Sequence, residues 1–394
     1  MIVPDAEKCT GCGACVQACP QKCISMENNG EGFLFPVVDR LKCAGCGICT
    51  EKCPLSAGGV PVCAPSGVYA AYAEDAGLLQ KSTSGGVCAV AAKEILRQGG
   101  VVFGAKMGRD FRARIIYIEK EEDLPELQGS KYVQAETGVS YREAAYFLQT
   151  GRKVLFTGTP CQIAGLRKFL GKDYEGLYTI DLVCHGVSSP GLFVSYVRYM
   201  EKKHGQNIKR WSFRDKIVDG WKVCDLIEFE NKTVKQRELL DPYTYTFLTG
   251  QSFRESCYTC PYAQKERCGD ITCGDYWGIK KAHPEIPEEQ GVSVLLVNTQ
   301  KGEELFSAVK GRLKTVESRF SLAAENNPNL SYPQQRPPER RDFYKKWAQM
   351  PMKDFVKEYM RPAFDIRETV RQYIPPEIRK RMKTLFGKCT GKKN

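Results

Sequence analysis

The chain has 394 residues, of which 42% are hydrophobic, so it can bury one large core or two smaller ones without disulfides. Residues 361–394 hold ten Lys or Arg and three Asp or Glu, which supplies +7 of the formal net charge of +12. The basic excess therefore describes a tail and gives no argument for nucleic-acid binding. The longest apolar runs, such as 292–297, are too short to cross a bilayer, and residues 1–10 do not resemble a secretion signal, which predicts a cytoplasmic protein.

A repeat of cysteines opens the chain. C-T-G-C-G-A-C-V-Q-A-C-P at Cys9–Pro20 is echoed by C-A-G-C-G-I-C-T-E-K-C-P at Cys43–Pro54, and Phe33–Asp39 between them is typical of a short strand. Nineteen cysteines can also form a disulfide framework, but such frameworks belong to small secreted domains. Metal or redox chemistry in a reducing compartment is therefore the better interpretation.

Each half of the repeat has the spacing C-x2-C-x2-C-x3-C-P, in which three close thiolates bind one 4Fe-4S cluster and the fourth binds the cluster of the other half. Glycines between the cysteines let the backbone turn tightly around a cluster. Two zinc sites are the alternative, but zinc knuckles need only two pairs of cysteines. The repeat therefore predicts two 4Fe-4S clusters, one bound by Cys9, Cys12, Cys15 and Cys53, and the other by Cys43, Cys46, Cys49 and Cys19.

Beyond Pro65, helical and strand-like segments alternate, which is typical of an α/β body. Ser84 can cap a helix that reaches about Gln98. Further helices are predicted at 141–148, 163–170 and 302–310, and strands at 101–105, 114–118, 154–156, 177–183, 223–229 and 292–298. Residues 328–341, rich in Pro, Asn and Gln, predict a linker or an arm across the surface.

A second group of cysteines follows in the body. Cys257, Cys260, Cys268 and Cys273 could bind zinc, bind a third cluster or remain reduced thiols, and their spacing does not decide among these. Cys161 and Cys184 each come just after a predicted strand, at the edge of a sheet where sites gather, so they could complete a cluster from a distance.

Several short motifs carry a family resemblance. They are S-T-S-G-G (82–86), G-S-K-Y (129–132), G-T-P-C-Q (158–162), D-L-V-C-H-G (181–186), C-x-x-C (257–260) and G-D-Y-W-G (274–278). With them, residues 82–299 resemble the beta subunit family of coenzyme F-420 hydrogenases and dehydrogenases. The cysteine-rich head is similar to the ferredoxin module fused to many members of that family. These motifs are specific in combination and weak one at a time.

The resemblance implies FAD and a third 4Fe-4S cluster in the body, whose ligands would be Cys161, Cys184, Cys257 and Cys260. A Gly-rich turn that opens a helix offers amide groups to a phosphate, and Lys131 adds a positive charge for the phosphate or the reduced ring. Lys131 and His185 are candidate catalytic residues, although His185 is also explained as a hydrogen-bonding neighbour of Cys184. Asp275 and Trp277 could line the flavin pocket or simply pack. The implied flavin-binding residues are Ser82, Ser84, Gly85, Gly86, Gly129, Ser130, Lys131, Tyr132 and Thr159.

Together these features predict an oxidoreductase that passes electrons from ferredoxin through 4Fe-4S clusters to FAD and on to an acceptor. The direction reverses if the partner is reduced coenzyme F-420, a deazaflavin. Similar fused proteins lie beside glycan biosynthesis genes, which suggests a sugar-linked or lipid-linked acceptor. The alternative is a non-catalytic electron-transfer subunit of a larger redox complex, which a head with its own clusters makes less favourable.

The predicted fold class is an α+β ferredoxin-like dicluster module (residues 1–62), an α/β flavin-binding body (63–300) and a helical extension with a basic tail (301–394). In the tail, Ile378, Met382, Leu385 and Phe386 would share one face of a helix surrounded by basic residues. Such a helix can contact the inner face of a membrane, remain solvated or dock on the protein's own body.

Overall fold

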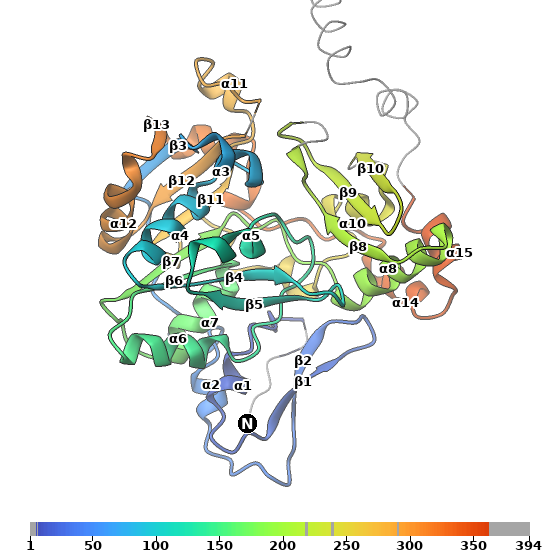
Figure 1. Cartoon of the computed structure of the whole chain (residues 1–394). Coiled ribbons are helices and arrows are strands. Elements are labelled where there is room, and N and C mark those ends of the chain that lie inside the picture. Colours follow the sequence, from blue (N-terminus) through green and yellow to red (C-terminus); the bar gives the residue numbers. More distant parts are fainter. Residues whose placement is uncertain (1–4, 6, 217–219, 238–239, 290, 362–394) are drawn as a thin grey trace, which may run out of the picture.

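The computed structural model describes residues 5, 7–216, 220–237, 240–289 and 291–361. The predicted amphipathic helix of the tail lies outside these residues. Figure 1 shows the N-terminal head below a larger body, with the head built from helix α1 (Ala14–Ala18), hairpin strands β1 (Ile24–Asn28) and β2 (Leu34–Val38), and helix α2 (Ile48–Glu51). The strand predicted at Phe33–Asp39 is confirmed as β2, which pairs antiparallel with β1.

An eight-stranded mixed sheet forms the centre of the body, in the order β13-β3-β12-β11-β7-β6-β4-β5. Its central strands β11, β7, β6 and β4 are parallel, whereas β5 at one edge and β12, β3 and β13 at the other are antiparallel to their neighbours. The strands are β3 (Gly67–Ala73), β4 (Val101–Met107), β5 (Ala113–Ile118), β6 (Val154–Gly158), β7 (Leu177–Leu182), β11 (Ile271–Asp275), β12 (Ser293–Val297) and β13 (Leu313–Glu317).

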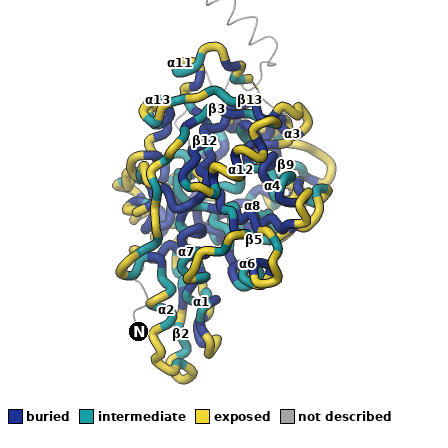
Figure 2. The backbone as a smooth tube through the Cα atoms, turned by 90° about the vertical axis from the view of Figure 1, so that its left-hand side faces the viewer, coloured by how far each residue is buried: buried dark blue, intermediate teal, exposed yellow. Residues whose placement is uncertain are grey.

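Helices cover both faces of this sheet, which explains why its strands are almost continuously apolar. Leu155 of β6 packs with α4 (Val87–Arg97) and α12 (Gln300–Lys310) on one face. Phe156 of the same strand packs with α6 (Ser140–Gln149) and α7 (Pro160–Leu170) on the other. Figure 2 shows the resulting buried layer through the middle of the body. The helices predicted at 141–148, 163–170 and 302–310 are thus confirmed.

Helix α4 begins later than the sequence predicts. Its first-turn cap is Gly86, whose φ of 81° suits glycine, and not Ser84. The Ser84 hydroxyl donates instead to the Val292 carbonyl at 3.1 Å, so this side chain ties the turn to the strand β12 region. The prediction of Ser84 as the helix cap was wrong because its hydroxyl bonds to the carbonyl of a residue from a distant segment.

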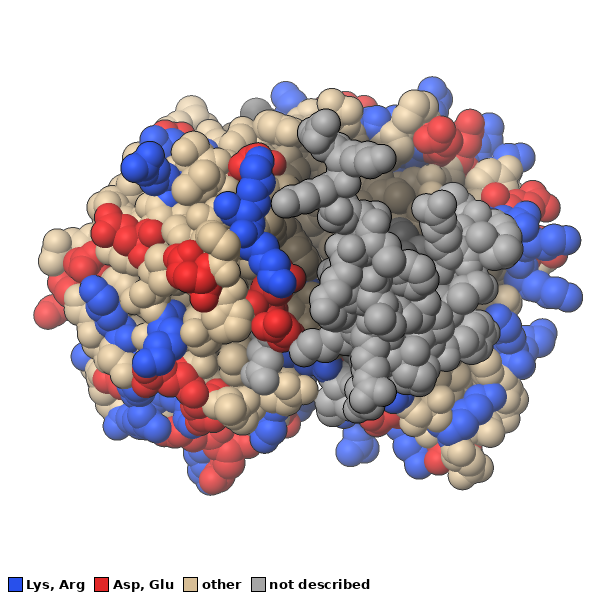
Figure 3. All heavy atoms as spheres, turned by 90° about the horizontal axis from the view of Figure 1, so that it is seen from above, with Lys and Arg blue, Asp and Glu red and all other residues tan. Residues whose placement is uncertain are grey.

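A second lobe packs a three-stranded antiparallel sheet against helix α8 (Pro190–His204). Its strands are β8 (Ile208–Ser212), β9 (Cys224–Phe229) and β10 (Thr233–Arg237), and helix α10 (Pro242–Leu248) follows. Phe193, Trp211, Phe213 and Tyr243 form its aromatic core. Only β9 was predicted here. Figure 3 shows acidic and basic side chains interspersed over the upper face of both lobes, with no single sign dominating the part that is described.

The region after residue 300 belongs to the same fold. β13 pairs with β3 in the large sheet, and helices α14 (Arg340–Trp347) and α15 (Met352–Glu358) pack against the second lobe. The predicted arm at 328–341 includes Arg340, which is buried and donates to Glu31 of the head and to the Phe253 carbonyl. The remaining short elements are α3 (Ala76–Lys81), α5 (Leu124–Leu127), α11 (Ile279–Ala282), α13 (Phe320–Glu325) and three 3-10 turns at Glu121–Asp123, Glu255–Cys257 and Pro328–Leu330.

Candidate functional site

Four cysteines of the head line one cavity, whose surroundings, including open solvent, hold about 350 Å³ of empty space. Three of them come from the first half of the repeat and the fourth from the end of the second half, as the sequence predicts. Met26, Pro36 and Leu55 add apolar walls. We call this the inner cavity; its cysteines are Cys9, Cys12, Cys15 and Cys53.

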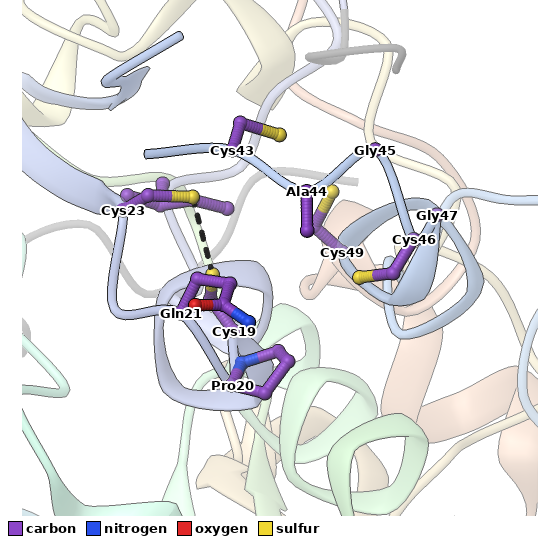
Figure 4. Close-up of a pocket in the computed structure, with 11 residues that line it drawn as sticks. Cys19, Pro20, Gln21, Cys23, Cys43, Ala44, Gly45, Cys46, Gly47 and Cys49 are labelled. Carbon is purple, nitrogen blue, oxygen red and sulfur yellow. Dashed lines mark hydrogen bonds between the residues drawn. The ribbon is translucent and has the colours of Figure 1, made fainter. Parts of the chain in front are cut away.

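A second cavity of similar volume is lined by the other predicted set, and we call it the outer cavity. Its cysteines are Cys43, Cys46, Cys49, Cys19 and a fifth, Cys23, whose role the sequence did not indicate. Figure 4 shows the Sγ atoms of Cys23 and Cys19 facing each other, 3.5 Å apart. Cys46 of the outer cavity is the one exposed cysteine of the two sets, whereas Cys9 of the inner cavity and Cys19 and Cys23 of the outer cavity are buried.

Glycines with positive φ shape both cavities. Gly11, Gly13, Gly45 and Gly47 have φ between 68° and 76°, and Gly13 and Gly47 cap the short helices α1 and α2. This conformation strains residues with a Cβ atom and lets successive amides point toward an anion. The donor set of four thiols, the apolar walls and these turns fit a 4Fe-4S cluster in each cavity.

The body holds the inner half of the head by hydrogen bonds to main-chain carbonyls. Gln134 Nε2 donates to Thr10 O at 2.9 Å, and Thr137 Oγ1 donates to Cys12 O at 2.9 Å. Arg254 Nε donates to Cys9 O at 2.6 Å. The inner cavity therefore lies at the contact between head and body.

The structure brings together the four body cysteines that the resemblance implies. Burial raises the pKa of the Cys184 thiol well above its usual range, and the nearby thiols of Cys257, Cys161 and Cys260 raise it further. Burial likewise raises the pKa of Cys161 to about 11 and that of Cys257 to about 12. Four thiols in one buried site strongly disfavour free thiolates, whereas bound iron would stabilise them.

The other two cysteines of this region have different partners. Cys268 Sγ donates to Pro160 O at 3.2 Å, and Cys273 of β11 interacts with Cys88 of α4. Within the described residues, no three His, Cys, Asp or Glu side chains are grouped closely enough to bind a single metal ion. Because Cys268 and Cys273 have these other partners, the better candidate set of cluster ligands is Cys161, Cys184, Cys257 and Cys260.

The inner cavity and the body cysteines are neighbours. Gly165 lies in the helix α7, one turn after Cys161, and a Cβ atom placed on it would stand 3.1 Å from Cys12 Sγ. Burial is the main cause of the raised pKa of Cys12, and a negative charge on the nearby Cys161 would raise it further. Helix α7 therefore approaches the inner cavity closely enough that any side chain at position 165 would force its neighbours to shift.

Two of the predicted flavin motifs meet beside α4. Ser130 N donates to Thr83 Oγ1 at 3.0 Å, which joins the G-S-K-Y turn to the S-T-S-G-G turn. Lys131 Nζ donates to the carbonyls of Leu127 and Gln128, and burial lowers its pKa to about 7. The Ser82 hydroxyl donates to Leu78 O, and Gly85 packs so closely on Ser293 that a Cβ atom would not fit there.

The remaining predicted residues lie elsewhere. Thr159 caps α7, and its Oγ1 lies 3.2 Å from Cys161 Sγ. His185 places both ring nitrogens within hydrogen-bond distance of protein acceptors, Asn329 Oδ1 and Leu248 O. Its contacts support the role of a structural neighbour, so the catalytic role of His185 stays a prediction.

The structure adds three residues that the sequence did not single out, namely Arg214, Lys216 and Trp221. Lys216 is buried, its Nζ donates to Ser84 O at 2.7 Å, and burial lowers its pKa to about 8. Arg214 pairs with Asp275 and stacks over Trp277, which stacks on Trp221 at 5.0 Å. Arg214 Nε and Nη2 are buried without a partner among the described residues. No motif marks these positions, because they follow the strand β8 in a lobe that the sequence barely predicted.

The buried cations and aromatic rings fit an anionic, planar cofactor. Lys216 supplies positive charge next to the Gly85–Gly86 turn through its bond to Ser84 O, the charge of Arg214 is paired with Asp275, and Tyr132 stacks on Phe247 at 4.3 Å. Burial raises the pKa of Tyr132 to about 12, which keeps its hydroxyl neutral and able to donate. A flavin carrying phosphates matches this combination of charge and flat surface.

Comparisons with known proteins agree with these features. Residues 68–139 and 151–319 match the models of the N- and C-terminal parts of the coenzyme F-420 hydrogenase/dehydrogenase beta subunit, and residues 8–57 match that of a 4Fe-4S dicluster domain. A chain of the F-420-reducing NiFe hydrogenase complex from Methanosarcina barkeri is 18% identical, with a TM-score of 0.46, over 69% of this chain and 97% of that chain. No curated protein matches. Since the family's two parts together span more than half of it, the chain belongs to the coenzyme F-420 hydrogenase/dehydrogenase beta subunit family and carries a 4Fe-4S dicluster domain at its N-terminus.

Proposed function

We propose that this protein is an iron-sulfur flavoprotein oxidoreductase that accepts electrons at the head and delivers them to an acceptor beside the α4 turn. The observation that carries the proposal is the contact between the inner cavity and α7, where Gly165 touches Cys12 one turn after Cys161. This contact joins the inner cavity to the body cysteines, and the electrostatic interaction of Cys15 with Cys49 joins the inner cavity to the outer one, so the three sites would form one series. The three sets are those lining the two cavities and the set Cys161, Cys184, Cys257 and Cys260.

Each residue set has a defined task in this series. The exposed Cys46 marks the outer cavity as the place where a donor such as reduced ferredoxin can approach. The buried body cysteines keep water from the inner end of the series. Clusters bound in these sites would carry single electrons, and FAD would combine two of them for hydride chemistry.

The turns beside α4 supply the residues that would hold FAD. Gly86 caps a helix of eleven residues, whose N-terminal end favours an anion, whereas the Gly85 amide already donates to Ser293 Oγ at 3.0 Å. Lys131 and Lys216 can hold or release a proton near neutral pH, because burial lowers their pKa values to about 7 and about 8. The sugar-linked acceptor stays a prediction without support from these contacts.

Metal and flavin analysis of the anaerobically purified chain tests the proposal. We expect about twelve irons and twelve acid-labile sulfides per chain, from three cubanes, and one noncovalent FAD. Reduced ferredoxin should bleach the flavin bands in the full chain and fail to do so in Cys43→Ser/Cys46→Ser, which removes two ligands of the outer site. Eight irons per chain would exclude the body cluster. Stoichiometric zinc would show that the body cysteines bind a structural metal ion instead.

A non-catalytic subunit is the second candidate, because the matching family is described as a beta subunit. In that case the chain passes electrons to a protein partner and has no acceptor of its own. Turnover of coenzyme F-420 or another small acceptor by the isolated chain supports the oxidoreductase. An iron-replete chain that cannot take up FAD would support the relay subunit instead.

A further inference from the structure

The deeply buried arginines of the body differ in how their charge is balanced. Arg254, Arg267 and Arg340 are at most 2% exposed. Arg267 pairs with Asp181 at 3.3 Å, and Arg340 pairs with Glu31 at 2.7 Å. No carboxylate pairs with Arg254 anywhere in the part of the chain that the structure describes. A buried cation without a counter-charge is strongly disfavoured, so this arginine needs an anion that the side chains do not provide.

The contacts of Arg254 are all with neutral groups. Its Nη1 donates to Leu34 O at 3.0 Å and to Gln134 Oε1 at 3.1 Å, and its Nε donates to Cys9 O. The guanidinium lies over the Phe35 ring at 3.8 Å. Nη2 is buried and has no hydrogen-bond partner within the described residues. The carbonyls orient the guanidinium but leave its charge unbalanced.

The guanidinium lies between the ligand sets of two sites. Cys9 belongs to the inner cavity, and Ser256 Oγ also donates to Cys9 O, at 3.1 Å. Arg254 O accepts from Cys257 N at 2.9 Å in the main chain, so the arginine belongs to the loop that carries the body cysteines. The thiols of Cys9, Cys257 and Cys161 all interact electrostatically with the guanidinium. Its unbalanced charge is therefore placed where two sets of iron-binding thiolates meet.

We propose that Arg254 is the shared counter-cation of the inner head cluster and the body cluster, and that it raises the reduction potentials of both. The inference rests on the proposed function, because it requires iron at both sites. A positive charge in a buried site stabilises whichever neighbouring site has gained an electron. The outer cavity has no such contact with Arg254, so an electron that enters there is drawn toward the inner pair.

The test is a redox titration, followed by electron paramagnetic resonance, of the full anaerobic chain and two variants. In Arg254→Gln, which removes the charge, the potentials of two clusters should shift to more negative values while the third stays unchanged. In Arg254→Lys, which keeps the charge, most of that shift should disappear. Arg340→Gln is the matched control: it removes a buried guanidinium at the same head–body contact whose main electrostatic partners are Glu31, Tyr344 and Tyr258 and not the cysteines, so no cluster potential should move.

Each possible result of these measurements either supports or overturns the proposal. Potentials that stay unchanged in an iron-replete Arg254→Gln overturn the proposal, as does an equal shift of all three clusters. If Arg254→Gln loses iron, Arg254→Lys is decisive: full iron and near-normal potentials support a charge effect, whereas equal loss shows that the arginine only shapes the loop. A wild-type chain with fewer than about twelve irons defeats the proposed function itself, before any variant is made.

Discussion

Cys23 makes the two halves of the cysteine repeat unequal. It lines the outer cavity with its Sγ 3.5 Å from that of Cys19, whereas the corresponding position of the second half is Ala57. The outer site thus has five thiols for four iron positions, and the inner site has four. The spacing rule predicts Cys19 as a ligand but says nothing about a thiol four residues later, which reaches the cavity only because the backbone turns after Pro20.

This inequality predicts different outcomes for matched mutations. Cys19→Ala should retain a 4Fe-4S cluster in the outer site, because Cys23 can bind the exposed iron. Cys53→Ala should convert the inner cluster to a 3Fe-4S form, because Ala57 offers no thiol. The EPR signal of the oxidised 3Fe-4S cluster distinguishes the two. A 3Fe signal in Cys19→Ala equal to that in Cys53→Ala would show that Cys23 cannot replace Cys19.

Lys131 gives flavin binding a predicted pH dependence. Burial lowers its pKa from the usual 10.5 to about 7, so without a ligand it loses its proton as the pH rises through 7. Only the protonated form attracts a phosphate or a reduced ring, so the affinity for FAD should fall between pH 6.5 and pH 8.5.

Fluorescence titration of the flavin-free chain measures this dependence. Lys131→Gln should bind FAD more weakly at pH 6.5 and lose most of the pH dependence, with unchanged iron content. Exposed Lys120→Gln serves as the control and should behave as wild type. An equal pH dependence in wild type and Lys131→Gln would assign it to another group, such as Lys216.

At the scale of elements, helix α7 connects the head to the body. It begins with a capping box between Thr159 and Gln162, follows the buried strand β6 and presents Gly165 to Cys12. The helix itself was predicted at 163–170 from its apolar spacing, without the first turn that begins at Pro160. The need for glycine in its middle could not be predicted, because the close neighbour comes from a distant part of the sequence.

Gly165→Ala should therefore disturb the contact between the two cysteine sites. Its Cβ atom would stand 3.0 Å from Cys12 Cβ and 2.8 Å from the Tyr141 hydroxyl. Overpacking of this kind costs about 1–3 kcal/mol, more than the gain in helix propensity. Thermal unfolding of the anaerobic protein should show a lower midpoint. Gly30→Ala, at a site with no neighbour within 4 Å, should leave the midpoint of thermal unfolding unchanged.

The sequence predicted the metal-binding elements better than the rest. The cysteine spacings are local, and the two cavities collect the predicted sets. The second lobe was largely missed, since its short strands β8 and β10 alternate poorly and only its packed aromatic core reveals them. Arg214 and Lys216 come from that lobe, so the bond of Lys216 to the S-T-S-G-G turn and the pairing of Arg214 with Asp275 depend on tertiary packing that no local pattern indicates.

At the scale of the whole molecule, the basic tail stays a prediction. None of the described helices is long and apolar enough to span a membrane. Residues 378–386 would form a short amphipathic helix, and each Lys or Arg near an anionic lipid surface contributes about 1 kcal/mol. We expect the full chain, but not a chain ending at Tyr373, to sediment with anionic vesicles at low salt. Equal recovery of both chains in the supernatant would contradict membrane contact, and the charge of the tail would then need another explanation, such as attraction to an acidic ferredoxin.

The hydrogen bonds that hold the head have a kinetic consequence. Arg254, Gln134 and Thr137 donate to the carbonyls of Cys9, Thr10 and Cys12 around the inner cavity, and Arg340 bonds to Glu31 in the β1–β2 turn. Because these bonds fix the head to the body, we expect it not to swing between a loading and an unloading position. Electron passage within the chain should therefore be insensitive to solvent viscosity, and glycerol should slow only the encounter with the external donor.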